Sequence, residues 1–192
     1  MAVSLNKGQS VSLKKSDGGT LTKVRMGLGW DAMKVKTMFG RTKEQAIDLD
    51  ASCLMFSADR VLLDQVWFSQ LRSKDGALVH LGDNRTGAGD GDDESIVVDL
   101  TAVSPSVQSL VFVVNSYSGE TFSQIENAFC RLIDASNEQE VARYDLSGSG
   151  PHTAQIMAKV TRDGTGWSMM ALGVRTSGRT IKDMLPAVAQ VL

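Results

Sequence analysis

The stretch Ile47-Asp48-Leu49-Asp50-Ala51-Ser52-Cys53-Leu54-Met55 decides the fold class of this chain. Its odd-numbered positions are all apolar, which is the period of two expected of a half-buried β-strand. Asp48, Asp50 and Ser52 stand between them and therefore point to the opposite face. The stretch predicts a strand with two carboxylates at its entrance.

The same alternation recurs along the chain. Val24, Met26, Leu28 and Trp30 share one face of a second predicted strand. Further β-like runs cover residues 66–71, 77–81, 95–100, 110–115, 128–133, 140–146, 154–161 and 167–174. Turn signals such as Lys74-Asp75-Gly76 separate most of them. About ten strands at this spacing predict an all-β fold, an antiparallel β-sandwich.

Two segments depart from the alternation. The C-terminal apolar residues recur at steps of three and four, which predicts a short helix that Pro186 kinks or starts. They are Ile181, Met184, Leu185, Val188 and Leu192. Residues 32–46 show no clear period, so we expect a mobile insertion loop there.

Length and composition indicate one domain spanning residues 1–192. The chain is 42% hydrophobic and 22% charged, as soluble globular proteins are. It has no apolar run long enough to cross a membrane, and its first residues lack the apolar core of a secretory signal, so we expect a cytoplasmic protein. Cys53 and Cys130 each lie in an apolar run, which favours two reduced core thiols.

The strongest chemical signal is the loop from Asp83 to Glu94, which places five carboxylates among glycines. Calcium takes six to eight oxygen ligands, and glycines allow the backbone to curl around the ion. The loop is not an EF-hand, because Arg85 and Gly87 stand where carboxylates are needed and Ala88 replaces the required glycine. Asp48 and Asp50 are expected to complete or bridge the ion. The competing interpretation is a solvated turn that discourages strand pairing.

Other chemistries have weaker support. His80 and His152 show no zinc-ligand spacing, and neither cysteine has a neighbouring histidine to activate it. The glycine-rich stretch lacks the lysine and hydroxyl of a phosphate-binding loop, and the basic residues between 34 and 43 are too few to predict a nucleic-acid partner. We assign no catalytic residue and expect no enzyme. The alternative is a metal-assisted hydrolase acting on a phosphate-containing substrate.

Several motifs resemble those of a known family. They are Ser4-Leu5-Asn6-Lys7-Gly8, Gly27-Leu28-Gly29-Trp30-Asp31, Ile47-Asp48-Leu49-Asp50-Ala51-Ser52, Gly82-Asp83-Asn84-Arg85-Thr86-Gly87, Gly89-Asp90-Gly91-Asp92-Asp93-Glu94, Asn127-Ala128-Phe129 and Ala142-Arg143-Tyr144-Asp145-Leu146. Over nearly its full length the chain resembles the TerD family of tellurium-resistance and stress proteins, and it is similar to the TerZ-like members.

The resemblance implies a β-sandwich that binds calcium, with two ions expected, in bacteria whose gene clusters confer resistance to tellurite, some phages and some colicins. It implies partners among the other proteins of the tellurium-resistance system, with the inner membrane surface as a candidate location. The implied metal ligands are Asp48, Asp50, Asp83, Asn84, Asp90, Asp92, Asp93 and Glu94, with Asp31 and a backbone carbonyl near Thr86 as further candidates. The resemblance thus implies a calcium-binding interaction module in tellurite resistance and the general stress response.

Overall fold

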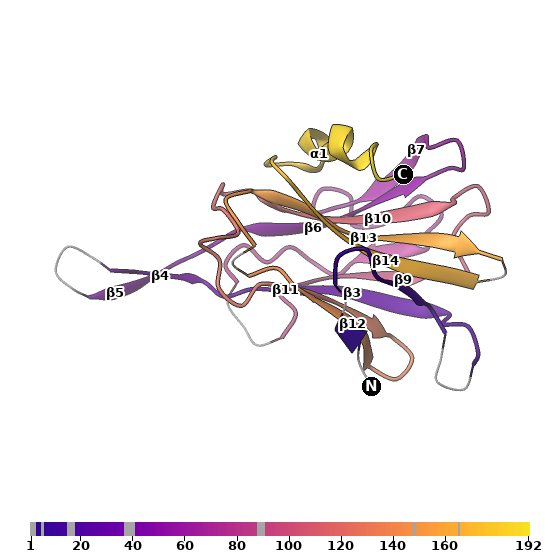
Figure 1. The fold of residues 1–192 in the computed structure, drawn as a ribbon, viewed down its shortest axis with the longest axis horizontal. Coiled ribbons are helices and arrows are strands. Elements are labelled where there is room, and N and C mark those ends of the chain that lie inside the picture. The colour runs from indigo at the N-terminus through magenta and orange to yellow at the C-terminus, as the bar shows by residue number, and fades with distance from the viewer. Residues whose placement is uncertain are drawn as a thin grey trace.

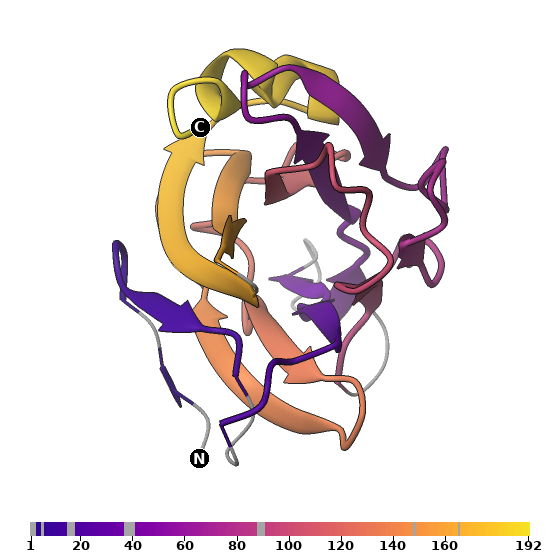
Figure 2. The ribbon, with the colours of Figure 1, turned by 90° about the vertical axis from the view of Figure 1, so that its right-hand side faces the viewer.

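Two six-stranded sheets pack face to face and form a β-sandwich (Figures 1 and 2). The structure is a computed structural model that describes residues 3–4, 6–14, 18–36, 41–87, 91–147, 149–164 and 166–192. The first sheet has the order β1 (Val3–Ser4), β12 (Gln139–Asp145), β11 (Phe129–Asp134), β3 (Lys23–Gly29), β9 (Glu94–Asp99) and β8 (Leu78–His80). The second has the order β2 (Ser10–Ser12), β14 (Gly166–Thr176), β13 (Ala154–Asp163), β10 (Ser109–Ser116), β6 (Leu49–Phe56) and β7 (Leu62–Val66).

Neighbouring strands within the two sheets pair in antiparallel fashion, apart from the short β1, which runs parallel to β12. This confirms the predicted antiparallel β-sandwich. The alternation in β6 also has its expected consequence, since Leu49, Ala51, Cys53 and Met55 belong to the core between the sheets. A strand of the second sheet therefore presents one apolar row inward.

A second hydrophobic cluster covers the opposite face of the same sheet. Leu54 and Phe56 of β6 pack there with the helix α1 (Ile181–Val188), through Ile181, Met184 and Val188. Figure 1 shows α1 lying across this outer face. Every residue of β6 is buried, and its apolar residues contribute to both clusters.

The C-terminal helix is confirmed, with Pro186 inside it. Its N-terminus is capped by Asp183, whose carboxylate accepts a hydrogen bond from the N–H of Thr180 at 2.9 Å. No helix in the described ranges is long and apolar enough to cross a membrane. Both cysteines are buried and free.

Two details of the sequence-based prediction were wrong. The strand expected at 66–71 lies earlier, as β7, because the backbone groups of Trp67 and Gln70 bond to each other and close a turn. The segment expected as a loop contains the strands β4 (Met33–Lys36) and β5 (Thr42–Gln45), which pair as a two-stranded sheet. Figure 1 shows this pair projecting from one end of the sandwich. Its mobility stays a prediction, and residues 37–40 lie outside the described ranges.

Candidate metal site

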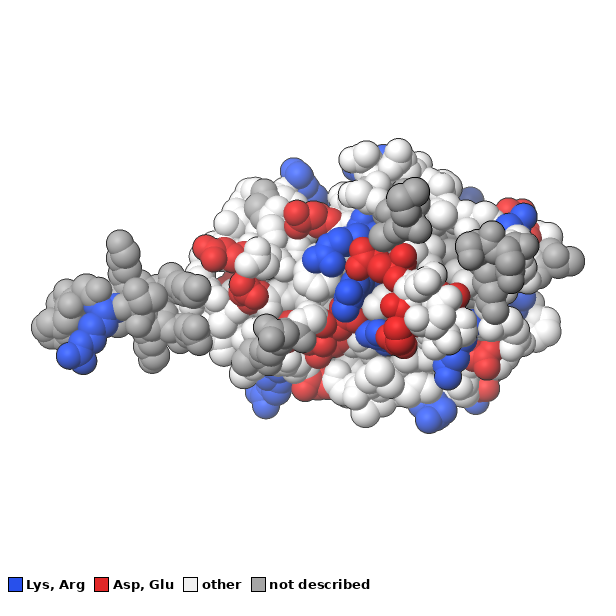
Figure 3. Space-filling view, turned by 90° about the horizontal axis from the view of Figure 1, so that it is seen from below, with Lys and Arg blue, Asp and Glu red and all other residues white. Residues whose placement is uncertain are grey.

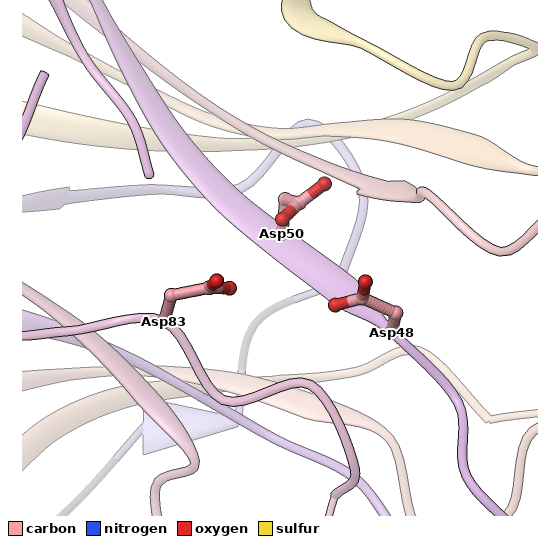
Figure 4. Close-up of side chains that lie close together, drawn as sticks. All are labelled: Asp48, Asp50 and Asp83. Carbon is pink, nitrogen blue, oxygen red and sulfur yellow. The ribbon is translucent and has the colours of Figure 1, made fainter. Parts of the chain in front are cut away.

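Three carboxylates converge where the two sheets meet. Asp48 directly precedes β6, Asp50 lies within that strand, and Asp83 belongs to the loop between β8 and β9 of the other sheet. One oxygen of each lies within 4.8 Å of the others. Figure 4 shows the three side chains facing a common space from these two segments. The two parts of the chain that the sequence singled out therefore meet in space.

Asp48 has an incompletely satisfied carboxylate. Its Oδ1 atom is buried and has no hydrogen-bond partner among the described residues. Burial raises the pKa of Asp48, and the negative charges of Asp83 and Glu120 raise it further, whereas Arg85 lowers it. A buried carboxylate oxygen without a partner is costly, so this atom favours a cation nearby.

Asp50 is almost fully buried, with 3% of its surface exposed. Burial, and then the charges of Glu94 and Asp48, raise its pKa from 3.8 to about 7. The Nδ2 atom of Asn115 donates a hydrogen bond to its Oδ2 at 2.9 Å and opposes this effect. One neutral donor does not balance three converging acids, so the electrostatic demand for a positive charge remains.

Glu94 lies near Asp50, and its carboxylate accepts hydrogen bonds from two backbone N–H groups. Its Oε2 accepts the N–H of Ala51 at 2.7 Å, and its Oε1 accepts the N–H of Asn84 at 3.2 Å. The Nε2 atom of His80 lies 3.4 Å from Oε2, and both side chains are fully buried. Burial raises the pKa of Glu94, while these neighbours lower it. Glu94 thus links β6 to the loop that carries Asp83.

Asp92 occupies a different environment. Its two oxygens pair with Arg25 and Arg131, at 2.6 Å and 2.7 Å, on the outer face of the first sheet. Figure 3 views this face and shows basic and acidic side chains side by side. Gly27 makes the arrangement possible, because a Cβ atom there would overlap the Asp92 carboxylate. The role of Asp92 as a calcium ligand stays a prediction, but both of its carboxylate oxygens already have cationic partners.

The other predicted ligands mostly bond to one another or to backbone. Asp93 accepts the N–H of Trp30 at 2.9 Å and the Nδ2 of Asn84 at 2.7 Å. Burial raises its pKa, and Asp31 and Asp92 raise it further, whereas the bond from Trp30 lowers it.

The amide oxygen of Asn84 accepts the N–H and the hydroxyl of Thr86 at 3.0 Å and 3.1 Å. Asp31 accepts a hydrogen bond from Asn127 at 2.6 Å. Asp90 lies outside the described residues. The roles of Asn84, Thr86, Asp31 and Asp90 as calcium ligands stay predictions.

Sequence reasoning missed several neighbours of the site. Phe68, Arg85 and Tyr117 line a cavity of about 220 Å³ together with the three carboxylates. Asn115 reaches Asp50 because the two residues are register partners on β10 and β6. Strand register was the signal that could have identified Asn115, whereas no local pattern marks the aromatic residues.

The fold and the site together define a class of protein. It is a β-sandwich in which carboxylates from both sheets gather at one site. The family model described as TerD domain matches residues 1–186. The chain belongs to the TerD family.

Curated relatives have tellurium-resistance and stress-response names. The chain is 44% identical to tellurium resistance protein TerZ of Serratia marcescens, over 95% of this chain and 94% of the relative. It is 37% identical to stress response protein SCP2 of Bacillus subtilis (strain 168), over 96% and 98% of the two chains. The family is thus one of tellurium-resistance and stress-response proteins.

A solved structure has the same fold. It is the crystal structure of a homologue of telluride resistance protein TerD from Streptomyces coelicolor A3(2), with a TM-score of 0.69 and 22% identity. The similarity covers 82% of this chain and 92% of that chain.

Proposed function

We propose that this protein is a calcium-binding, non-enzymatic interaction module of tellurite resistance and the general stress response, with its principal ion at Asp48, Asp50 and Asp83. The convergence of these carboxylates around the partnerless Oδ1 of Asp48 is the observation that carries the proposal. Membership of the TerD family supplies the biological context.

The donor set fits calcium. Three carboxylates offer up to six hard oxygen ligands, and calcium prefers six to eight oxygens at about 2.3 to 2.6 Å. Oxygens on opposite sides of such an ion are separated by roughly twice that bond length, close to 5 Å, and the observed spread is within 4.8 Å. Soft metals have less support, because Cys53 and Cys130 are buried in the core and neither thiol joins the carboxylate group.

An ion here would act on the shape of the surface. Asp83 belongs to a loop of one sheet, and Asp48 and Asp50 belong to the other. Neutralising their repulsion would hold the loop against β6 and fix the surface that a partner protein contacts. We place the partners among other proteins of the tellurium-resistance system and the protein itself in the cytoplasm.

A binding role is favoured over metal-assisted hydrolysis. The carboxylates around the cavity would serve as ligands, and the ring of His80 is buried against Glu94. This leaves neither group available as the general base that metal-assisted hydrolysis commonly employs.

Calorimetric titration of metal-free protein with calcium and with magnesium tests the proposal. We expect saturable calcium binding that Asp83→Asn weakens at least tenfold, roughly the loss of one charged ligand. Asp59→Asn, in an exposed turn between β6 and β7, is the matched control and should bind as the wild type does. Equal calcium binding by wild type and Asp83→Asn would contradict the assignment, and calcium-dependent hydrolysis of p-nitrophenyl phosphate would contradict the non-enzymatic role.

A further inference from the structure

We propose that the cavity beside the three carboxylates binds an oxyanion carried on a planar aromatic group. The inference rests on the proposed calcium site and goes beyond it, by giving the ligand class that the ion and its surroundings would hold together. The anion would lie between the ion and Arg85, and the aromatic group would contact Phe68 and Tyr117.

The open side of the ion site supplies the first argument. The cavity is lined by the three carboxylates and by Phe68, Arg85 and Tyr117. Three carboxylates do not complete the coordination of calcium unless all of them are bidentate, so positions facing the cavity remain for other oxygens. Phosphate or carboxylate oxygens are the ligands that a hard cation accepts there.

Arg85 supplies the second argument. It is exposed and lines the same cavity as the three carboxylates. Within the described chain it nevertheless forms no ion pair with any acid. A guanidinium group presents a planar fork of donors that matches a phosphate or carboxylate. Together with the ion, Arg85 would place two positive centres on the same small space.

The aromatic rings supply the third argument. The rings of Phe68 and Tyr117 meet edge to face, with centroids 5.9 Å apart. The side chain of Tyr117 belongs to the exposed large apolar groups, with 47% of its surface exposed. Rings in this arrangement offer a planar ligand a face and an edge to contact. The cavity is therefore lined by both charged and aromatic groups.

The test uses full-length protein loaded with calcium and three small probes: phenyl phosphate, inorganic phosphate and benzyl alcohol. We expect phenyl phosphate to bind at least tenfold more tightly than either fragment, because only this probe contacts both the charged and the aromatic lining groups. The rings of Trp67 and Phe68 lie 4.7 Å apart, so Trp67 fluorescence provides a readout beside calorimetry. Repeating the titration with the phenylacetate anion distinguishes a phosphate source from a carboxylate source of the same chemistry.

Variants locate the probe. Arg85→Gln should weaken phenyl phosphate binding by roughly tenfold, as loss of a charge-assisted hydrogen bond does. Arg72→Gln, another exposed arginine, should leave it unchanged. Tyr117→Ala and Phe68→Leu should each weaken phenyl phosphate binding about fivefold and leave inorganic phosphate binding unaffected.

The two proposals fail separately. If calcium does not bind, the ion site is wrong. If calcium binds with wild-type stoichiometry and phenyl phosphate binds no better than inorganic phosphate, the ion site stands and this inference is overturned. Equal affinities of the Arg85→Gln and Arg72→Gln variants for phenyl phosphate would also overturn it.

Discussion

Replacing Asp50 by asparagine should stabilise the metal-free protein at high pH and abolish its stabilisation by calcium. The pKa of Asp50 is about 7 in the folded protein, against 3.8 for an aspartate outside the folded structure. This difference corresponds to roughly 4 kcal/mol between the two protonation states. The substituted amide would keep the shape of the side chain and an oxygen for the Nδ2 of Asn115, while removing the buried charge.

The sign follows from proton linkage. A folded-state pKa above the unfolded value means that the folded form holds its proton more tightly, so this contribution is present at low pH. It is lost as pH rises from 3.8 towards 7 and is fully lost above that range. Metal-free wild type should therefore lose stability between about pH 4 and pH 8 relative to Asp50→Asn, by up to about 4 kcal/mol.

Urea unfolding in the presence of a chelator, at about pH 4.5 and pH 8, measures this difference. In excess calcium the difference at pH 8 should shrink by about 2.7 kcal/mol, because an ion at a hundredfold excess over its dissociation constant stabilises the wild type by that amount and leaves Asp50→Asn without the gain. Asp59→Asn serves as the control and should show neither effect. Equal stability of wild type and Asp50→Asn at pH 8 without metal would refute the buried-charge argument.

Three further outcomes are expected. Asp92→Asn should reduce the free energy of unfolding by about 1 to 3 kcal/mol, because Arg25 and Arg131 each lose one of their two carboxylate partners, yet leave calcium affinity within about twofold of the wild type; a loss as large as that of Asp83→Asn would instead support Asp92 as a calcium ligand. Gly27→Ala should destabilise by about 1 to 3 kcal/mol through overlap with Asp92, seen as a lower urea midpoint. Cys53 and Cys130 should react with a thiol reagent only after unfolding, because burial raises the pKa of both, that of Cys130 to about 12; rapid labelling of native protein would contradict this.

The sandwich was predictable because alternation reports a locally half-buried strand. β6 shows the signal clearly, since Leu49, Ala51 and Cys53 all enter the core. The signal failed where strands have no full core face. β7 is an edge strand whose burial pattern, with an exposed Leu63, does not alternate simply. The pair of β4 and β5 projects from the sandwich, and the sequence from 32 to 46 has no clear period.

The site was predictable only in part, for a related reason. Composition identifies Asp83 and the two aspartates at the start of β6 as candidates, but not which acids share a space. Asp92 illustrates the limit, since its partners lie on β3 and β11, strands brought together by antiparallel pairing. The sequence alone does not distinguish a carboxylate that pairs with two arginines from a carboxylate that lies beside two other carboxylates. Register and sheet order decide the difference.

The position of the site explains how one ion could act on the whole end of the sandwich. Glu94, on β9, accepts a hydrogen bond from the backbone of Ala51, on β6, and so already joins the two sheets. The carboxylate cluster lies beside this link and carries the repulsion of Asp83 against Asp48 and Asp50. Without a cation, attraction at Glu94 and repulsion at Asp83 act on the same loop in opposite directions. A calcium ion would remove the repulsion and leave the hydrogen bonds of Glu94 intact. Its binding would therefore hold that loop against β6, beside the cavity that Arg85 lines.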